Sequence, residues 1–180
     1  MDKQLIIFTD SGDTIVDEGT EVRDENGIVI HAELIPGAGD TLKALWEAGY
    51  RIALVADGEE QSFTNTYVEN GLGYCFHTRT ISEIVGIQKP SERMFQDAMD
   101  KNGLTEADKG RIIMVGNNIR KDVAGANRFG ITSVLLDWSP RYDMEPKSAE
   151  EQADYIIHHP AELLELVERL ERQLENGPLK

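Results

Sequence analysis

The sequence predicts an α/β fold in which helices cover both faces of a doubly wound parallel sheet. Short apolar runs alternate along the chain with stretches that repeat apolar residues at helical spacing. Unbroken apolar runs are typical of strands buried on both faces, and strand–helix alternation implies right-handed crossovers between parallel strands. The chain has 180 residues, which is the size of one domain, so we expect a single domain over residues 1–180.

Six short segments are predicted as strands. Most are runs of apolar or β-branched residues, and two of them stop at the turn residues Asp57-Gly58 and Gly116-Asn117. The run at 74–76 is weaker than the others but continues the alternation with helices. The predicted strands, in chain order, are 5–8, 52–55, 74–76, 112–115, 132–136 and 155–157.

Five helices are predicted between and after these strands. Ser91 is a good N-cap for one of them, and Asn102-Gly103 is a typical helix end. Pro160 and Gly177-Pro178 suit the two limits of the last helix, whose leucines recur at helical spacing. The predicted helices are 38–48, 59–69, 91–101, 119–128 and one that begins near residue 160.

A β-hairpin flap is predicted at about residues 20–35, where the strand–helix alternation is interrupted. Asp24-Glu25-Asn26-Gly27 separates two short segments that contain Val22 on one side and Ile28 and Ile30 on the other. Asn-Gly between such segments is the strongest short-range signal for a hairpin. The flap follows directly after the first predicted strand and its turn.

The net charge of the chain limits which classes of partner it can bind. Eighteen basic and 33 acidic residues give a formal net charge of −15. A field of this sign repels nucleic acid and anionic membrane surfaces, so neither is expected as a partner. The apolar runs are too short for a signal peptide or a membrane span, which favours a cytoplasmic protein. The sequence leaves open whether the protein forms a homo-oligomer.

Residues that could carry chemistry are predicted to gather at one edge of the sheet. Asp10, Asp57 and Asn117 each follow a predicted strand, and ligands of parallel sheets bind outside the carboxyl ends of the strands. Asn117 and Asp122 offer oxygen donors that suit a hard cation, although helix capping is an equal alternative. Pro90 favours an extended backbone at Lys89, which would aim its amine in a fixed direction.

Together, in order and spacing, these elements resemble the haloacid dehalogenase-like (HAD) hydrolase superfamily, in its capless or minimal-cap type. The resemblance covers residues 5–136. The segments Lys89-Pro90 and Gly116–Asp122 match it best, and Gly125-Ala126-Asn127 is similar to the stretch that follows the last motif of this family. About twenty residues separate Thr14 from Pro36, enough for the hairpin alone, so the resemblance implies an open site.

The resemblance implies a magnesium-dependent hydrolase, with a phosphate monoester as substrate. Asp10 stands at the position of the family's aspartate nucleophile, which forms an aspartyl-phosphate. Mg²⁺ would be held by the Asp10 carboxylate, the Gly12 carbonyl, Asn117 and Asp122. Lys89 would pair with the nucleophile and the phosphoryl group. A cation and an ammonium group together would neutralise the charge that otherwise keeps a phosphate away from a carboxylate.

Two departures concern proton transfer and the metal. The family usually has a second aspartate two residues after the nucleophile, as general acid/base, and here that position is Gly12. Asp13, one residue later, is an alternative catalytic residue if the turn is rotated. Asn117 stands where an acidic residue is usual, and its neutral oxygen should bind Mg²⁺ more weakly.

A third departure concerns substrate binding. Ala56 lacks the hydroxyl that the family's second motif offers to the phosphate. The backbone amides of Asp57 and Gly58, with Lys89, are the remaining candidates for binding phosphate oxygens. Farther along, Arg141 lies in a segment that is either a packed loop or an anion-binding contact.

Three functions remain open at this point. The first is a magnesium-dependent phosphatase acting through Asp10. The second is a catalytically degenerate protein of the same fold with a binding or structural role, which Gly12, Ala56 and Asn117 favour. The third is a phospho-receiver domain, which would need an aspartate after the third strand. The chain has Phe76-His77-Thr78-Arg79 near that place, which argues against it.

Overall fold

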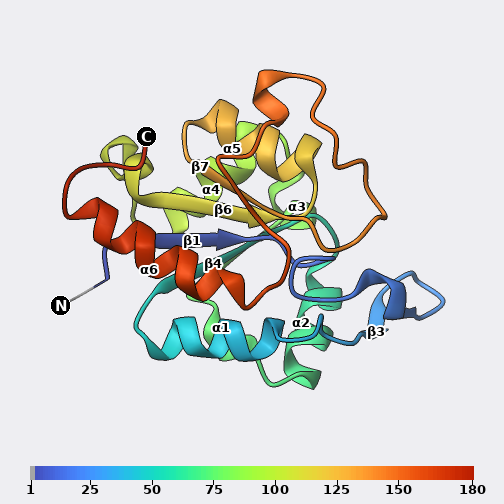
Figure 1. The fold of residues 1–180 in the computed structure, drawn as a ribbon. Coiled ribbons are helices and arrows are strands. Elements are labelled where there is room, and N and C mark those ends of the chain that lie inside the picture. Colours follow the sequence, from blue (N-terminus) through green and yellow to red (C-terminus); the bar gives the residue numbers. More distant parts are fainter. Residues whose placement is uncertain (1–2) are drawn as a thin grey trace.

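The computed structural model describes residues 3–180, and its centre is a parallel sheet. Figure 1 shows the sheet lying between two layers of helices, with a small antiparallel hairpin at one end. The sheet has six strands in the order β5-β4-β1-β6-β7-β8, and every neighbouring pair is parallel. The strands are β1 (Ile6–Thr9), β4 (Arg51–Ala56), β5 (Thr78–Ile81), β6 (Ile112–Gly116), β7 (Thr132–Leu136) and β8 (Tyr155–Ile157).

Two layers of helices bury the two faces of the sheet. The apolar residues of α1 and α6 pack on one face, and those of α4 and α5 pack on the other (Figure 1). The predicted doubly wound α/β fold is therefore confirmed. The helices are α1 (Ala38–Glu47), α2 (Glu60–Glu69), α3 (Ser82–Val85), α4 (Glu92–Lys101), α5 (Ala124–Phe129) and α6 (Glu162–Leu174).

Alternation along β1 explains why the sheet needs both layers. Leu5 and Ile7 belong to the cluster that contains α1 and α6, whereas Ile6 and Phe8 belong to the cluster that contains α4. Successive side chains of a strand point to opposite faces, so an unbroken apolar run is stable only where both faces are covered. All four residues are buried.

The predicted strand at 74–76 is wrong. Gly73–Cys75 form a short 3₁₀ turn, and the third strand in chain order along the parallel sheet is β5, a few residues later. As an edge strand, β5 has only its Thr80 and Ile81 end buried, so it lacks the continuous apolar run of a central strand. A threonine-rich segment with one arginine therefore gives a weaker signal than the apolar Tyr74-Cys75-Phe76 before it.

The predicted hairpin is confirmed as β2 (Val22–Arg23) and β3 (Val29–His31). It lies beside α2, to which it is tied by hydrogen bonds from Val29 N–H to Ser62 Oγ (3.0 Å) and from Asn65 Nδ2 to the Val29 carbonyl (2.8 Å). The hairpin projects at the end of the sheet where the parallel strands finish (Figure 1).

The predicted helix at 119–128 begins differently from a regular α-helix. Ile119–Val123 form a π-helical turn, and the α-helix α5 starts only at Ala124. The Asn118 side chain caps this turn, because its Oδ1 accepts hydrogen bonds from the N–H groups of Arg120 (3.0 Å) and Lys121 (3.1 Å). Such wide turns often occur at functional sites. Here the turn carries Asp122 to the edge of the sheet.

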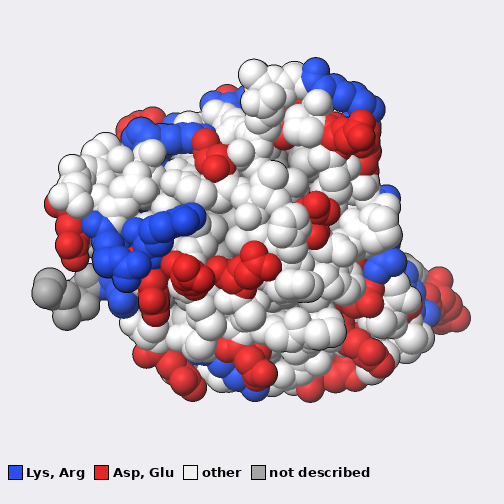
Figure 2. Space-filling view, viewed as in Figure 1, with Lys and Arg blue, Asp and Glu red and all other residues white. Residues whose placement is uncertain are grey.

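Charged side chains of both signs cover the outside. Figure 2 shows acidic and basic groups intermixed on one face, with many acidic groups at the end that carries the hairpin. Among residues 3–180, no helix combines the length and the apolar character that crossing a bilayer requires.

Packing of α4 against α5 predicts a large effect of one core substitution. Phe95 is fully buried, its ring stacks on Phe129 with centroids 5.6 Å apart, and it leaves no room for a side chain at Gly125. Phe95→Ala is expected to lower the free energy of unfolding by about 3–5 kcal/mol. Urea denaturation followed by circular dichroism measures this. Val68→Ala, at a side chain that is 71% exposed, is the control and should change it by less than about 0.5 kcal/mol.

Candidate active site at the carboxyl edge of the sheet

Asp10 lies at the middle of the sheet, directly after β1. Thr9 pairs with Leu54 of β4 on one side and with Val115 of β6 on the other. The Asp10 N–H continues the ladder by donating to the Val115 carbonyl (2.9 Å). Because neighbouring parallel strands end together, this register brings the residues after β4 and β6 next to the Asp10 carboxylate.

Lys89 joins three of these strand ends through one ammonium group. Its Nζ donates to Asp10 Oδ1 (2.8 Å), to Asp122 Oδ1 (2.7 Å) and to the Val55 carbonyl (2.8 Å). An ammonium group has three N–H donors, so all of them are used and the direction of the group is fixed. The side chains of Lys89 and Asp122 are each 1% exposed, whereas that of Asp10 is 16% exposed.

The electrostatics of this cluster follow from its burial. Burial disfavours the charged form of Lys89, but attraction to Asp10 and Asp122 outweighs it and holds the pKa of Lys89 above its ordinary value. For Asp122, burial and repulsion from Asp10 raise the pKa, and the attraction to Lys89 only partly offsets them. Asp122 is therefore less readily ionised than an ordinary aspartate, and Lys89 is the cation that holds it beside Asp10.

Asp57 holds the segment that carries Lys89. Its Oδ1 accepts the Lys89 backbone N–H (3.0 Å), and its Oδ2 pairs with Lys121 Nζ (2.8 Å). The Gly58 amide, a predicted ligand of phosphate oxygens, donates instead to Ser82 Oγ (2.9 Å). Asp57 thus holds the backbone at Lys89 in place. It also pairs with Lys121, which is partly exposed and lines the cavity.

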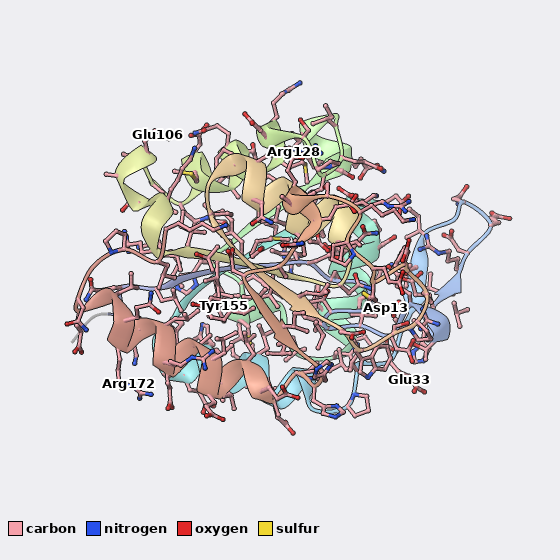
Figure 3. The ribbon with its side chains drawn as sticks, turned by 45° about the horizontal axis from the view of Figure 1, so that its top comes forward. Asp13, Glu33, Glu106, Arg128, Tyr155 and Arg172 are labelled. Carbon is pink, nitrogen blue, oxygen red and sulfur yellow. The ribbon has the colours of Figure 1, made fainter. Side chains whose placement is uncertain are left out.

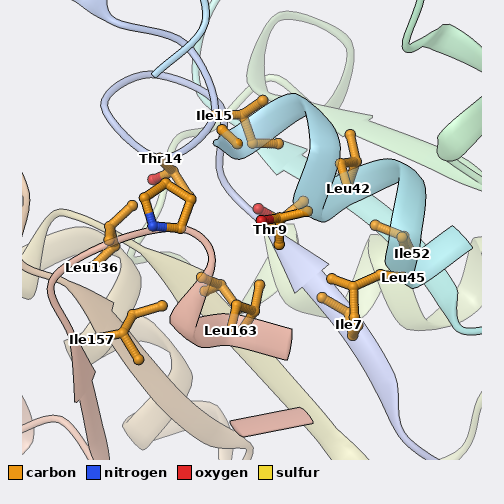
Figure 4. A pocket seen from close by; sticks show the side chains of 14 residues that line it. Ile7, Thr9, Thr14, Ile15, Leu42, Leu45, Ile52, Leu136, Ile157 and Leu163 are labelled. Carbon is orange, nitrogen blue, oxygen red and sulfur yellow. The ribbon is translucent and has the colours of Figure 1, made fainter. Parts of the chain in front are cut away.

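A polar cavity of about 210 Å³ opens at this edge. Within residues 3–180, four carboxyl groups and two ammonium groups line it, so carboxyl groups outnumber ammonium groups by two. The pocket that Figure 4 shows lies deeper, between α1, α6 and the sheet, and is lined by aliphatic residues and threonines with no charged group. The polar cavity is lined by Asp10, Gly12, Glu18, Asp57, Gly58, Gln88, Lys89, Asn117, Asn118, Lys121, Asp122 and Tyr142.

The oxygen donors around the cavity fit a divalent cation. Asp10, Gly12, Asn117 and Asp122, the predicted ligands, all line it. Asn117 is buried, and its Nδ2 lacks a hydrogen-bond partner among the described residues. A half-turn of the amide places an oxygen there, since the two orientations have the same shape. Carbonyl and carboxylate oxygens are the donor set that Mg²⁺ prefers.

Asp13 points away from these groups. It has a left-handed backbone with φ of 48°, which aspartate tolerates better than most residues. Its buried carboxylate accepts hydrogen bonds from Arg141 Nε (2.7 Å) and from the Glu18 N–H (3.1 Å). Figure 3 places Asp13 at the same end of the molecule as the hairpin. Arg141, which also pairs with Asp17, anchors this turn and is not directed at an anion in the cavity.

Three residues that line the cavity were missed by the sequence analysis: Glu18, Lys121 and Tyr142. Tyr142 O–H donates to Glu18 Oε2 (3.0 Å). Burial first, and then the charge of Asp13, raise the pKa of Glu18 above its ordinary value. Lys121 had a weak signal, because it precedes Asp122 in a predicted helix start. Tyr142 also had a weak signal, because it directly follows Arg141 in a segment with two alternatives, a packed loop or an anion-binding contact. Glu18 had none, since its position depends on how the loop after β1 folds back on the sheet.

Comparisons with known proteins agree with this geometry. A family model described as haloacid dehalogenase-like hydrolase matches residues 3–130. A glyceraldehyde 3-phosphate phosphatase of Methanopyrus kandleri is 31% identical over 135 residues, which cover 75% of this chain and 57% of that protein. The chain therefore spans a little more than half the length of this relative.

Solved structures share the fold. An uncharacterized protein of Listeria monocytogenes serotype 4b superposes with a TM-score of 0.75 at 17% identity, covering 93% of this chain and 99% of that one. The HAD-hydrolase YfnB of Bacillus subtilis, described as bound to magnesium, has a TM-score of 0.65 at 23% identity, covering 75% and 56%. The family model spans well over half of the sequence and coincides with the described site, so the chain belongs to the haloacid dehalogenase-like hydrolase family.

Proposed function

We propose that this protein is a magnesium-dependent phosphatase that hydrolyses a phosphate monoester through an aspartyl-phosphate at Asp10. The observation that carries the proposal is the ammonium group of Lys89, which binds Asp10 and Asp122 at 2.8 and 2.7 Å beside an open polar cavity. A fold that kept no chemistry would have no reason to retain an ammonium group buried between two carboxylates, because burying charges is costly.

Asp10 acts as the nucleophile in this proposal. Lys89 binds its Oδ1 and thereby holds the carboxylate in one orientation, with its exposed part towards the cavity. Asp10 attacks the phosphorus atom, the ester oxygen leaves, and the resulting aspartyl-phosphate is hydrolysed by water. Lys89 and Lys121 favour the approach of a phosphate dianion, and Lys121, which is 38% exposed, is placed to meet its oxygens.

Four residues would hold the magnesium ion: Asp10, Gly12 through its carbonyl, Asn117 and Asp122. When bound, Mg²⁺ would supply positive charge that lets a phosphate dianion approach the carboxylates. The carboxyl groups of Asp10 and Asp122 and the unpartnered Asn117 amide, all at the cavity, support this assignment. The description of YfnB as bound to magnesium supports it for the same fold.

Substrate binding is proposed to involve Lys89 together with the Ala56–Gly58 segment. Gly58 N–H is engaged by Ser82, so within this segment the Asp57 amide is the proposed donor to the phosphate. We further propose that residues 1–180 act as one domain, with the hairpin as its minimal cap, in the cytoplasm. The name of the Methanopyrus kandleri relative supports a small phosphorylated metabolite as substrate.

Loss of the nucleophile tests the activity directly. The purified protein should hydrolyse p-nitrophenyl phosphate in the presence of Mg²⁺, and Asp10→Asn should lower kcat on the order of 10³-fold or more. Asp24→Asn, in the exposed hairpin turn, is the matched control and should keep the wild-type rate. Equal residual rates in wild type and Asp10→Asn would instead support the catalytically degenerate alternative.

A charge change at Asn117 tests the metal site. Asn117→Asp adds a negative ligand, so it should tighten Mg²⁺ binding by roughly tenfold, because affinity follows the charge of the ligands. Isothermal titration calorimetry measures the dissociation constant without reference to activity. Asn26→Asp, on the exposed hairpin, adds the same charge elsewhere and should leave the affinity unchanged. An equal gain in both variants would refute a specific site at Asn117.

Removal of Lys89 tests the charge balance. Lys89→Met leaves Asp10 and Asp122 next to each other without their ammonium partner, so the free energy of unfolding should fall by roughly 3–5 kcal/mol in the absence of Mg²⁺. Addition of Mg²⁺ should recover part of this loss if the ion binds between the same carboxylates. Lys147→Met, at an exposed ion pair, is the control and should change stability by less than about 1 kcal/mol.

A further inference from the structure

We infer that Glu18 is the proton-transfer residue of the site, acting on the leaving group and then on water. The inference rests on the proposed phosphatase function. Glu18 lies in a 3₁₀ turn, Glu18–Thr20, eight residues after Asp10, and it lines the same cavity.

A tight reversal of the chain brings Glu18 back to Gly12, which lies two residues after Asp10. The N–H groups of Thr14, Ile15 and Val16 all donate to the Ser11 carbonyl, at 3.1, 2.8 and 3.1 Å. This folds residues 11–16 into one compact turn and forms a bridge between Gly12 and Val16. The segment that follows therefore runs back past the start of the turn, and Glu18 ends beside Gly12.

The Glu18 carboxylate fills the space that a side chain at position 12 would take. A Cβ built on Gly12 would overlap Glu18 Oε1 and lie 2.7 Å from Glu18 Cδ. The backbone of Gly12 is not left-handed, so glycine is needed there for room and not for conformation. Gly12 and Glu18 thus form a complementary pair, in which the absence of one side chain admits the other to the cavity.

Elimination among the cavity carboxylates also selects Glu18. Asp10 and Asp122 bind Lys89, and Asp57 binds Lys121. Across residues 3–180, Glu18 is the one cavity carboxylate without a cationic partner within 4 Å, and Tyr142 O–H is its neutral donor. A proton-transfer group must be able to turn towards the substrate, and the ion pairs hold the other three carboxylates in fixed positions. Asp13, in contrast, is fixed by its ion pair with Arg141.

The proton follows a closed cycle in this scheme. In the first step the bond from Asp10 to phosphorus forms, the phosphorus–oxygen ester bond breaks, and protonated Glu18 gives its proton to the leaving oxygen, which departs as an alcohol. In the second step the Glu18 carboxylate takes a proton from water as the water oxygen attacks phosphorus. The bond to Asp10 then breaks, and inorganic phosphate leaves with Glu18 protonated again.

Glu18→Gln tests this with two esters and a transient measurement. The p-nitrophenolate leaving group needs no proton, so the variant should release a burst of p-nitrophenol equal to the enzyme present and accumulate phosphoryl-enzyme. Mass spectrometry of the quenched protein detects that species. Steady-state turnover of p-nitrophenyl phosphate should fall by about 10²–10⁴-fold at the second step. With an alkyl phosphate, the first step should also slow and the burst should disappear.

Three further measurements separate the alternatives. Glu33→Gln, at an exposed glutamate, should behave as wild type, and Mg²⁺ affinity should be unchanged in Glu18→Gln. Activity lost in Glu18→Ala should partly return in Gly12→Asp/Glu18→Ala, where the vacated space admits a new carboxylate. An unchanged rate in Glu18→Gln, equal slowing of both esters without a burst, or a loss of Mg²⁺ affinity would each overturn the inference. If wild type hydrolyses neither ester, the proposed function fails as well.

Discussion

The ammonium group of Lys89 is buried where three strands of the sheet end, and the arrangement of the site depends on its three hydrogen bonds. They reach Asp10 after β1, the Val55 carbonyl in β4 and Asp122 beyond β6. These partners are 79, 34 and 33 residues away in the sequence, so the contact forms only when the sheet is in register. Two carboxylates buried so close together would repel each other strongly without it. The fold and the chemistry therefore share one electrostatic centre.

One ammonium group does not balance the cavity. Asp57 adds to the charge of Asp10 and Asp122, and Lys121 is the second ammonium group that lines the same cavity. In the proposed function, the carboxylates that face the opening bind a cation, and a phosphate dianion then enters a cavity of reduced negative charge. The overall acidity of the protein, with a net charge of −15, makes this local neutralisation more important for an anionic substrate.

Much of the fold and the centre of the site could be predicted from the sequence. Apolar runs covered on both faces identify central strands, and the rule that ligands bind at their carboxyl ends placed Asp10, Asp57 and Asn117 at one edge. The family resemblance then added Lys89 and Asp122 to this group. The prediction of strands failed at the edge of the sheet, where a strand is only partly buried. The edge strand β5 has a mixed pattern because only its Thr80 and Ile81 end is buried, so the apolar run before it gave the stronger signal.

The position of Glu18 could not be predicted, because it depends on the closing of one turn and not on a motif. Gly12 lines the cavity but has no side chain, and the aspartate stands one residue later, at position 13. Asp13, with its left-handed backbone, instead directs its carboxylate to Arg141 and fixes the turn. The same turn returns the chain so that a longer side chain, from six residues later, reaches the empty space. The side chain that is missing at Gly12 is thus replaced by that of Glu18. A carboxyl group lies at the same place beside the cavity, although it comes from a different position in the sequence.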